Sequence, residues 1–96
     1  MPKIVKVSVE INIPQFLQHL TSDVKVVNSS GGNVGECLDD LVKQFPQVKS
    51  RLFNENGELL KYLEIYINGE SAYPEELSKP VVDGDELHIV NIIVGG

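Results

Sequence analysis

The chain has 96 residues, of which 42% are hydrophobic and 23% are charged, and its formal net charge is −6. This length and composition are typical of one globular domain and exclude a disordered chain. The negative charge disfavours binding to nucleic acid or to anionic membranes and favours a basic partner. No stretch approaches the roughly 20 apolar residues of a membrane span, and the first residues lack the apolar run of a signal peptide, so we predict a cytoplasmic protein.

Alternation predicts the first strand. Apolar side chains occupy every second position, at Val5, Val7, Val9, Ile11 and Ile13. This period of two indicates a strand with one buried face. Pro14 ends the strand, because proline has no N–H to donate to a sheet. A second, less regular strand is expected around Val24 to Val27.

Apolar residues then recur at helical spacing over residues 34–45, which predicts an amphipathic helix. Asn33 is placed to cap this helix, and Glu36 follows three residues later, as in a capping box. Pro46 disfavours helical geometry at the residue before it and therefore marks the end of the helix. Residues 47–60 are mostly polar and are expected to form a connection.

The second half of the chain predicts three more strands. Residues 62–67 form the third strand, and Asn68-Gly69 suits a tight hairpin turn because both residues tolerate positive φ. A short return strand is expected over residues 71–73. The last strand follows the turn Asp83-Gly84-Asp85 and runs from residue 86 to about residue 94.

The order of these elements defines the fold class. We predict an α+β fold with a mixed sheet of four to five strands and one main helix packed on one face. The other face of the sheet stays open to solvent or to a partner. Residues 1–94 are expected to form a single domain, and residues 95–96 a flexible Gly-Gly tail, because chain ends and glycines have the greatest backbone freedom.

The end of the chain, Val94-Gly95-Gly96, carries the chemistry. Two residues without side chains can thread a narrow channel and present a terminal carboxylate inside another protein. ATP can convert that carboxylate to an acyl-adenylate, and a sulfur nucleophile can then displace AMP and leave a thiocarboxylate. A glycine pair by itself is equally typical of a frayed tail. The glycine pair becomes evidence for a function because a small domain with a β-strand leads directly into it.

Several segments of the chain match one family. They are Asn12-Ile13-Pro14, the helix over 34–45, Ile65-Tyr66-Ile67-Asn68, Asp83-Gly84-Asp85-Glu86-Leu87 and Val94-Gly95-Gly96. Over nearly its whole length the chain resembles the ubiquitin-like, β-grasp sulfur carriers, which include the small subunit of molybdopterin synthase and the thiamine-pathway carrier. Residues 63–68 are most similar to the branch that carries sulfur for cysteine-type amino-acid synthesis. Molybdopterin-type carriers often have prolines just before Ala-Gly-Gly, and the run Asn91-Ile92-Ile93-Val94 departs from that pattern.

The resemblance implies that Gly96 bears the adenylate and then the thiocarboxylate, and that Gly95 threads beside it. Val90, Ile92 and Val94 would dock on an adenylyltransferase of the ubiquitin-activating type. The chain would be a protein co-substrate rather than an enzyme and would need no cofactor, because the partner uses the ATP. A sulfur-accepting biosynthetic enzyme would be its second partner. Three alternatives remain open: a ubiquitin-like modifier joined to lysines through the same tail, the small subunit of molybdopterin synthase, or a passive interaction domain.

Other reactive residues lack the spacing of a catalytic or metal site. Cys37 is the single cysteine, so an internal disulfide and a cysteine-rich metal site are excluded, and its place early in the helix favours a packed thiol over a nucleophile. His19 is expected in a surface loop and His88 on the open sheet face. Gly31-Gly32 lacks the lysine of a phosphate-binding loop.

Overall fold

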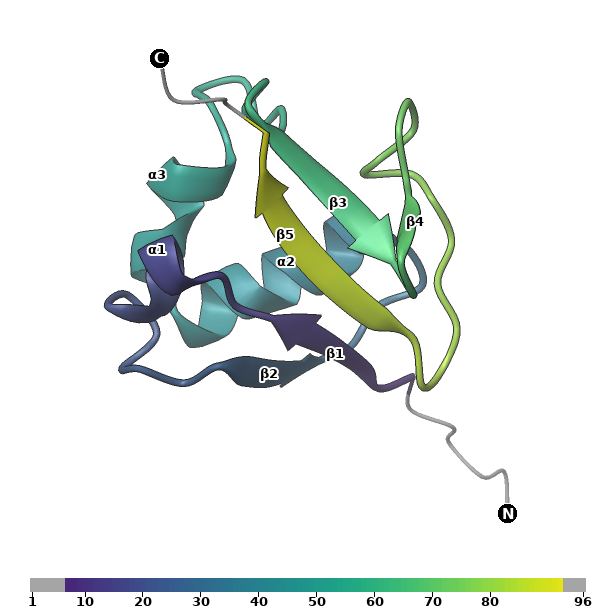
Figure 1. The fold of residues 1–96 in the computed structure, drawn as a ribbon, viewed down its shortest axis with the longest axis horizontal. Helices are drawn as coiled ribbons and strands as arrows, with labels where there is room; N and C mark the ends of the chain where they lie inside the picture. Colours follow the sequence, from purple (N-terminus) through teal and green to yellow (C-terminus); the bar gives the residue numbers. More distant parts are fainter. Residues whose placement is uncertain (1–6, 93–96) are drawn as a thin grey trace.

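The structure, a computed structural model, describes residues 7–92 (Figure 1). Its elements in chain order are β1 (Val9–Asn12), α1 (Gln15–Gln18), β2 (Val26–Ser29), α2 (Val34–Gln44), the 3₁₀ helix η1 (Pro46–Val48), α3 (Lys49–Leu52), β3 (Leu63–Ile67), β4 (Glu70–Ser71) and β5 (Glu86–Asn91). The strands form one mixed sheet in the order β2-β1-β5-β3-β4. The predicted α+β class and the mixed sheet are confirmed.

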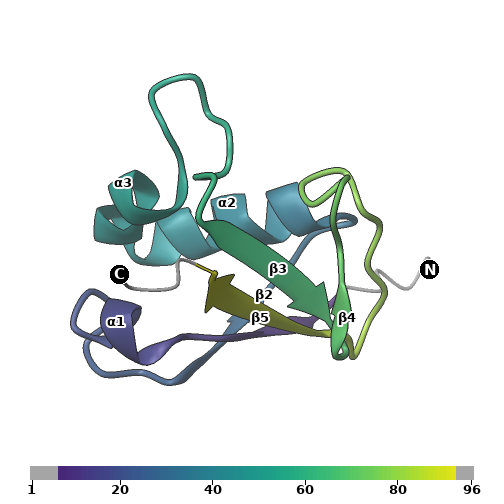
Figure 2. The ribbon, with the colours of Figure 1, turned by 45° about the horizontal axis from the view of Figure 1, so that its top comes forward.

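The last strand lies in the middle of this sheet. β5 pairs in parallel with β1, with Leu87 opposite Ile11, and in antiparallel with β3, with Ile89 opposite Ile65. A parallel pair needs a long crossover connection, and α2 lies within that connection. Figures 1 and 2 show α2 running across one face of the sheet. The first and last strands are therefore neighbours, although most of the chain separates them.

A single hydrophobic core fills the space between α2 and the sheet. The strands contribute the alternate residues predicted from their period of two, among them Ile11, Ile65 and Leu87, which are fully buried. Leu38 and Leu41 of α2 are also fully buried and meet them from the helix. Burial of one such side chain stabilises the fold by about 1.5–3 kcal/mol, so this layer supplies most of the driving force for folding.

The ends of α2 follow the local signals in the sequence. Asn33 Oδ1 accepts a hydrogen bond of 2.8 Å from the backbone N–H of Glu36. The carboxylate of Glu36 reaches back to accept a bond of 2.7 Å from the N–H of Gly32, one residue earlier than in a standard capping box. Phe45, which precedes Pro46, has left helical geometry with a φ of −137°.

Three short helical segments were not predicted. α1 follows Pro14 directly, and η1 and α3 occupy part of residues 47–60, which the sequence indicated as a polar connection. That prediction was wrong for the first half of the segment, because Val48 and Leu52 are fully buried in the core. Segments of three or four residues hold too few apolar positions to show a helical period. In residues 7–92, no helix has both the length and the apolar character needed to cross a bilayer.

Some strand boundaries also differ from the predicted ones. β2 begins two residues later than expected, and β4 consists of residues 70–71 rather than 71–73. The hairpin turn between β3 and β4 is as predicted, with Asn68 and Gly69 at φ of 51° and 87°. β5 ends at Asn91, and the predicted continuation of this strand beyond Ile92 lies outside the described residues.

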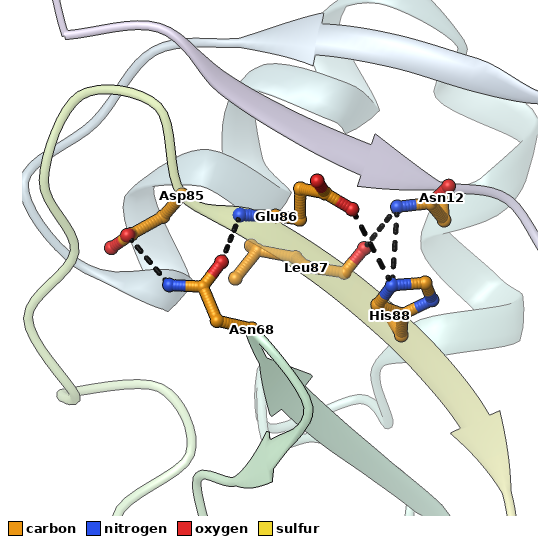
Figure 3. A network of polar contacts seen from close by, with 6 residues as sticks. All are labelled: Asn12, Asn68, Asp85, Glu86, Leu87 and His88. Carbon is orange, nitrogen blue, oxygen red and sulfur yellow. Dashed lines mark hydrogen bonds and ion pairs between the residues drawn. The ribbon is translucent and has the colours of Figure 1, made fainter.

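A polar network fixes the start of β5 (Figure 3). The side chain of Asn68 donates to Asp85 Oδ1 at 2.8 Å and accepts from the backbone N–H of Glu86 at 2.9 Å. The other carboxylate oxygen of Asp85 accepts from the N–H of Val82 at 2.8 Å. Asn68 therefore joins the hairpin to the turn that precedes β5, in a left-handed conformation that asparagine tolerates. This contact sets the position at which β5 begins.

We expect Asn68→Ala to lower the free energy of unfolding by about 2 kcal/mol, because it removes two hydrogen bonds and places alanine in a left-handed conformation. Urea denaturation measures this change. Asn56→Ala, in an exposed turn, is the matched control and should change the free energy by no more than about 0.5 kcal/mol. Equal losses in the two variants would contradict the role of the network.

Candidate functional site

The predicted site residues lie at and beyond the end of β5. Val94, Gly95 and Gly96 lie outside the described residues, so their predicted roles are not tested by the structure. Val90 is half-buried, and Ile92 is 46% exposed. The part of the site that the structure describes is therefore the end of β5, which precedes the glycine pair in the chain.

The end of β5 is held on one side by β3. The backbone N–H of Ile92 donates to the carbonyl of Tyr62 at 2.8 Å, one residue beyond the pair formed by Asn91 and Leu63. On the other side, pairing with β1 ends at His88. Four residues follow Ile92, and at 3.3–3.6 Å per residue they span at most about 14 Å. Any chemistry at Gly96 takes place within this distance of the sheet.

The open face of the sheet presents a row of side chains that crosses all five strands. The register places Val26, Asn12, His88, Tyr66 and Ser71 side by side in this row. His88 is on the open face as predicted, with its Nε2 3.4 Å from Asn12 Nδ2 and 3.9 Å from Glu86 Oε1 (Figure 3). Val90 lies one step nearer to the tail, opposite Glu64 of β3.

This face is acidic. The strands in the described part of the chain contain no lysine or arginine. Glu10 and Glu86 stand directly opposite each other across β1 and β5, and Glu64 lies on β3. Like charges placed opposite each other destabilise a sheet. A basic partner surface would remove this repulsion, which matches the partner charge expected from composition.

Exposed apolar side chains add to the site at the same end of the sheet. Phe16 is 39% exposed, Val24 39% and Val26 45%. Phe16 follows the end of β1, Val24 precedes β2 and Val26 begins it. Because β1 and β5 are parallel, both strands point towards this end of the sheet, although β5 runs three residues beyond His88, the partner of the last residue of β1. The sequence did not single out these residues, because α1 gave no periodic signal. Val82, 65% exposed, precedes the start of β5 and so lies at the opposite end.

Comparison with known proteins identifies the family. The ThiS family matches residues 11–96, from β1 through the glycine pair. This chain belongs to the ThiS family. Small archaeal modifier protein 1 of Haloferax volcanii is 36% identical to it over 73 residues, which make up 76% of this chain and 80% of that protein.

Solved structures agree with this assignment to the ThiS family. A chain in the crystal structure of the BexX/CysO complex of Amycolatopsis orientalis superposes with a TM-score of 0.83 at 32% identity, covering 92% of this chain and 99% of that one. CysO of Mycobacterium tuberculosis, described as an antigen, gives a TM-score of 0.81 at 28% identity, covering 88% and 99%. The β-grasp fold and the resemblance to ubiquitin-like sulfur carriers, including the CysO-like branch, are confirmed.

The remaining reactive residues of this ThiS-family chain do not form a site. Cys37 is fully buried in α2, and burial, reinforced by the nearby carboxylates of Asp40 and Glu36, raises the pKa of its thiol from 9.0 to about 11. A thiol that stays protonated is a poor nucleophile, so the predicted packed role is confirmed. His19 is exposed in the turn that follows α1, which confirms the predicted surface loop. Within residues 7–92, no group of three or more potential ligands could hold a metal ion.

We expect a disulfide reagent such as Ellman's reagent to react with Cys37 at pH 8 only as fast as the protein unfolds. Fast reaction of the native protein would contradict the buried, protonated thiol.

The raised pKa of Cys37 also has a consequence for stability. The contribution of the Cys37 thiol to the free energy of unfolding is fully present below pH 9.0 and is lost as the pH rises to about 11. In this range the thiol ionises in the unfolded state but stays protonated in the folded state. Cys37→Ala should remove this part of the alkaline pH dependence in urea titrations.

Proposed function

We propose that this chain is a sulfur carrier protein whose terminal Gly96 carboxylate is adenylated and then converted to a thiocarboxylate. The observation that carries the proposal is the ThiS-family match, which runs through Gly95-Gly96, a few residues further along the chain than the central strand β5. A carboxylate oxygen attacks the α-phosphorus of ATP and releases pyrophosphate. A sulfide-level nucleophile then forms a bond to the carbonyl carbon as the bond to AMP breaks.

In this reaction the chain is a co-substrate and not an enzyme. It contributes the tail and a docking surface, and the adenylyltransferase contributes the ATP site, so the chain needs no cofactor of its own. The thiocarboxylate then passes its sulfur to a biosynthetic enzyme in the cytoplasm. The likeness to CysO supports the branch expected from residues 63–68, in which the product is a cysteine-type amino acid rather than molybdopterin.

The adenylyltransferase docks on the open face and on the apolar end of the sheet. Val90 and Ile92 are the apolar residues nearest to the tail along the described chain, and Val94 would continue them. Phe16 and Val26 extend the same apolar end across the sheet. The carboxylates of the open face favour a basic surface on the partner, which would speed association and orient it.

Protein modification is a second candidate, supported by the 36% identity to small archaeal modifier protein 1. Activation of Gly96 would be the same. The acyl group would then pass to a lysine amine, so that an amide bond forms in place of the thiocarboxylate. Both functions use one tail, and the acceptor distinguishes them.

The deciding experiment combines intact-mass measurement with blots. The untagged protein, purified from its host, should carry sulfur in place of one oxygen, and fragmentation should place the change on Gly96. A thiocarboxylate-selective alkylating probe should label it. A ladder of larger, lysine-linked species in blots of the host lysate would instead favour the modifier.

Deletion of Gly96 should abolish ATP–pyrophosphate exchange by the cognate adenylyltransferase, because the group that attacks ATP is then misplaced by one residue. The domain should remain folded, with unchanged urea denaturation. Normal exchange by the shortened chain would refute activation at Gly96.

Ile92→Glu should raise the KM of the adenylyltransferase for this chain about tenfold, because a charge replaces an apolar side chain at the docking end. Val82→Glu adds the same charge to an exposed position at the opposite end of β5 and is the matched control. Little change in KM for the control and a large one for Ile92→Glu are expected in steady-state exchange assays. Similar effects in both variants would show that net charge alone is responsible.

A further inference from the structure

Two adjoining hollows, which share Leu59 and Glu76, lie beside two connections and reach Ile92, just past the end of β5. One hollow, with a volume of about 440 Å³, is lined by residues 57–59 and 74–78. The other hollow, of about 250 Å³, extends from Leu59 and Glu76 to Ile92. We call the whole the loop groove. In Figure 2 the two connections can be followed before β3 and after β4.

The loop groove has an apolar floor and an acidic rim. The floor contains Leu59, Leu60 and Leu63, which are buried or half-buried. The rim carries four carboxylates and a single lysine, namely Glu58, Glu64, Glu75, Glu76 and Lys61. The groove is therefore apolar inside and negatively charged at its border.

Two of the rim carboxylates already have partners. Glu58 accepts a hydrogen bond of 3.0 Å from Asn54, and Glu64 accepts one from Ser71. In the part of the chain that the structure describes, no side chain bonds to the carboxylates of Glu75 or Glu76. These two groups can therefore receive an external cation.

Tyr73 stands in the same groove and is 71% exposed, the highest value among the large apolar side chains of the described chain. An aromatic ring beside carboxylates is suited to an arginine or lysine, since the ring face attracts the cation and the carboxylate pairs with it. The leucines of the floor can take the aliphatic part of such a side chain.

We propose that the loop groove binds an arginine- or lysine-bearing segment of a partner protein that acts on the tail. The inference rests on the proposed function, in which partners approach Gly96. The negative charge of the rim favours a basic occupant. The groove ends at Ile92, which at most about 14 Å of chain separates from Gly96, so its location favours a partner that acts on the tail.

The groove borders the surface proposed for the adenylyltransferase and shares Glu64 and Ile92 with it. Apart from Glu64 and Ile92, its lining residues do not belong to the open face. One partner in the groove and another on the open face can therefore be distinguished by mutation. The groove gives the sulfur-accepting enzyme its own place beside the tail.

The test uses a fluorescein-labelled peptide of alternating arginine and leucine, titrated with the full chain and followed by anisotropy. Replacing arginine by citrulline, which is neutral and of similar shape, should abolish binding. The triple variant Glu58→Gln, Glu75→Gln and Glu76→Gln should bind the arginine peptide about tenfold more weakly. Tyr73→Leu, which keeps the bulk and loses the ring, should weaken binding severalfold.

A second triple variant, Asp23→Asn, Asp39→Asn and Glu70→Gln, removes the same charge at exposed positions outside the groove. It should change the affinity less than about twofold. Equal weakening in the two triple variants, or no binding by the unmodified chain, would overturn the proposal. Chemical-shift changes confined to the open face on adding the peptide would overturn it as well.

Failure of this inference can be told apart from failure of the proposed function. The groove variants are also assayed for ATP–pyrophosphate exchange with the adenylyltransferase, which should proceed as for the unmodified chain. Exchange without peptide binding would leave activation of Gly96 intact and refute only the groove. Peptide binding without exchange would refute the activation and leave the groove as a basic-segment site.

Discussion

The parallel pairing of β1 with β5 determines the rest of the architecture. Because parallel neighbours cannot be joined by a tight turn, the intervening chain has to leave the sheet and return, and α2 covers the core on the way. The same pairing places the last strand in the centre of the sheet, where β3 supports it on the other side. The tail therefore begins at a strand that is tied to both halves of the domain.

This arrangement assigns stability and the proposed docking to opposite faces of the sheet. Packing of α2 against the inner face provides stability and uses no residue of the outer face. The outer face can consequently keep an unfavourable pair of carboxylates, Glu10 and Glu86, and exposed apolar groups near the tail. These features weaken the isolated domain slightly and improve its fit to a basic partner.

Local signals in the sequence were sufficient for much of the fold. The Asn33 cap, the stop before Pro46 and the hairpin at Asn68-Gly69 each depend on residues within a few positions, and each is found as expected. α1, η1 and α3 were missed because each buries only one side chain within a single turn, as Leu17 does in α1. The family marks indicated the candidate site at Gly96. The structure adds Phe16 and Val26, which come to the same end of the sheet as Ile92 only through the pairing of distant strands. The loop groove joins two connections with no periodic pattern, so no sequence signal could have revealed it.

The central place of β5 also has a mechanical consequence. In the proposed activation, an enzyme that drew the glycine pair into a channel would pull along the axis of this strand. The hydrogen bonds to β1 and β3 lie across that axis, so the load falls on many of them at once, in shear, instead of opening them one after another. An edge strand at the same position could be peeled away by a much smaller force. The domain can thus stay folded while force is applied to its tail. The hydrogen bond from Ile92 to Tyr62 is the first to bear that force.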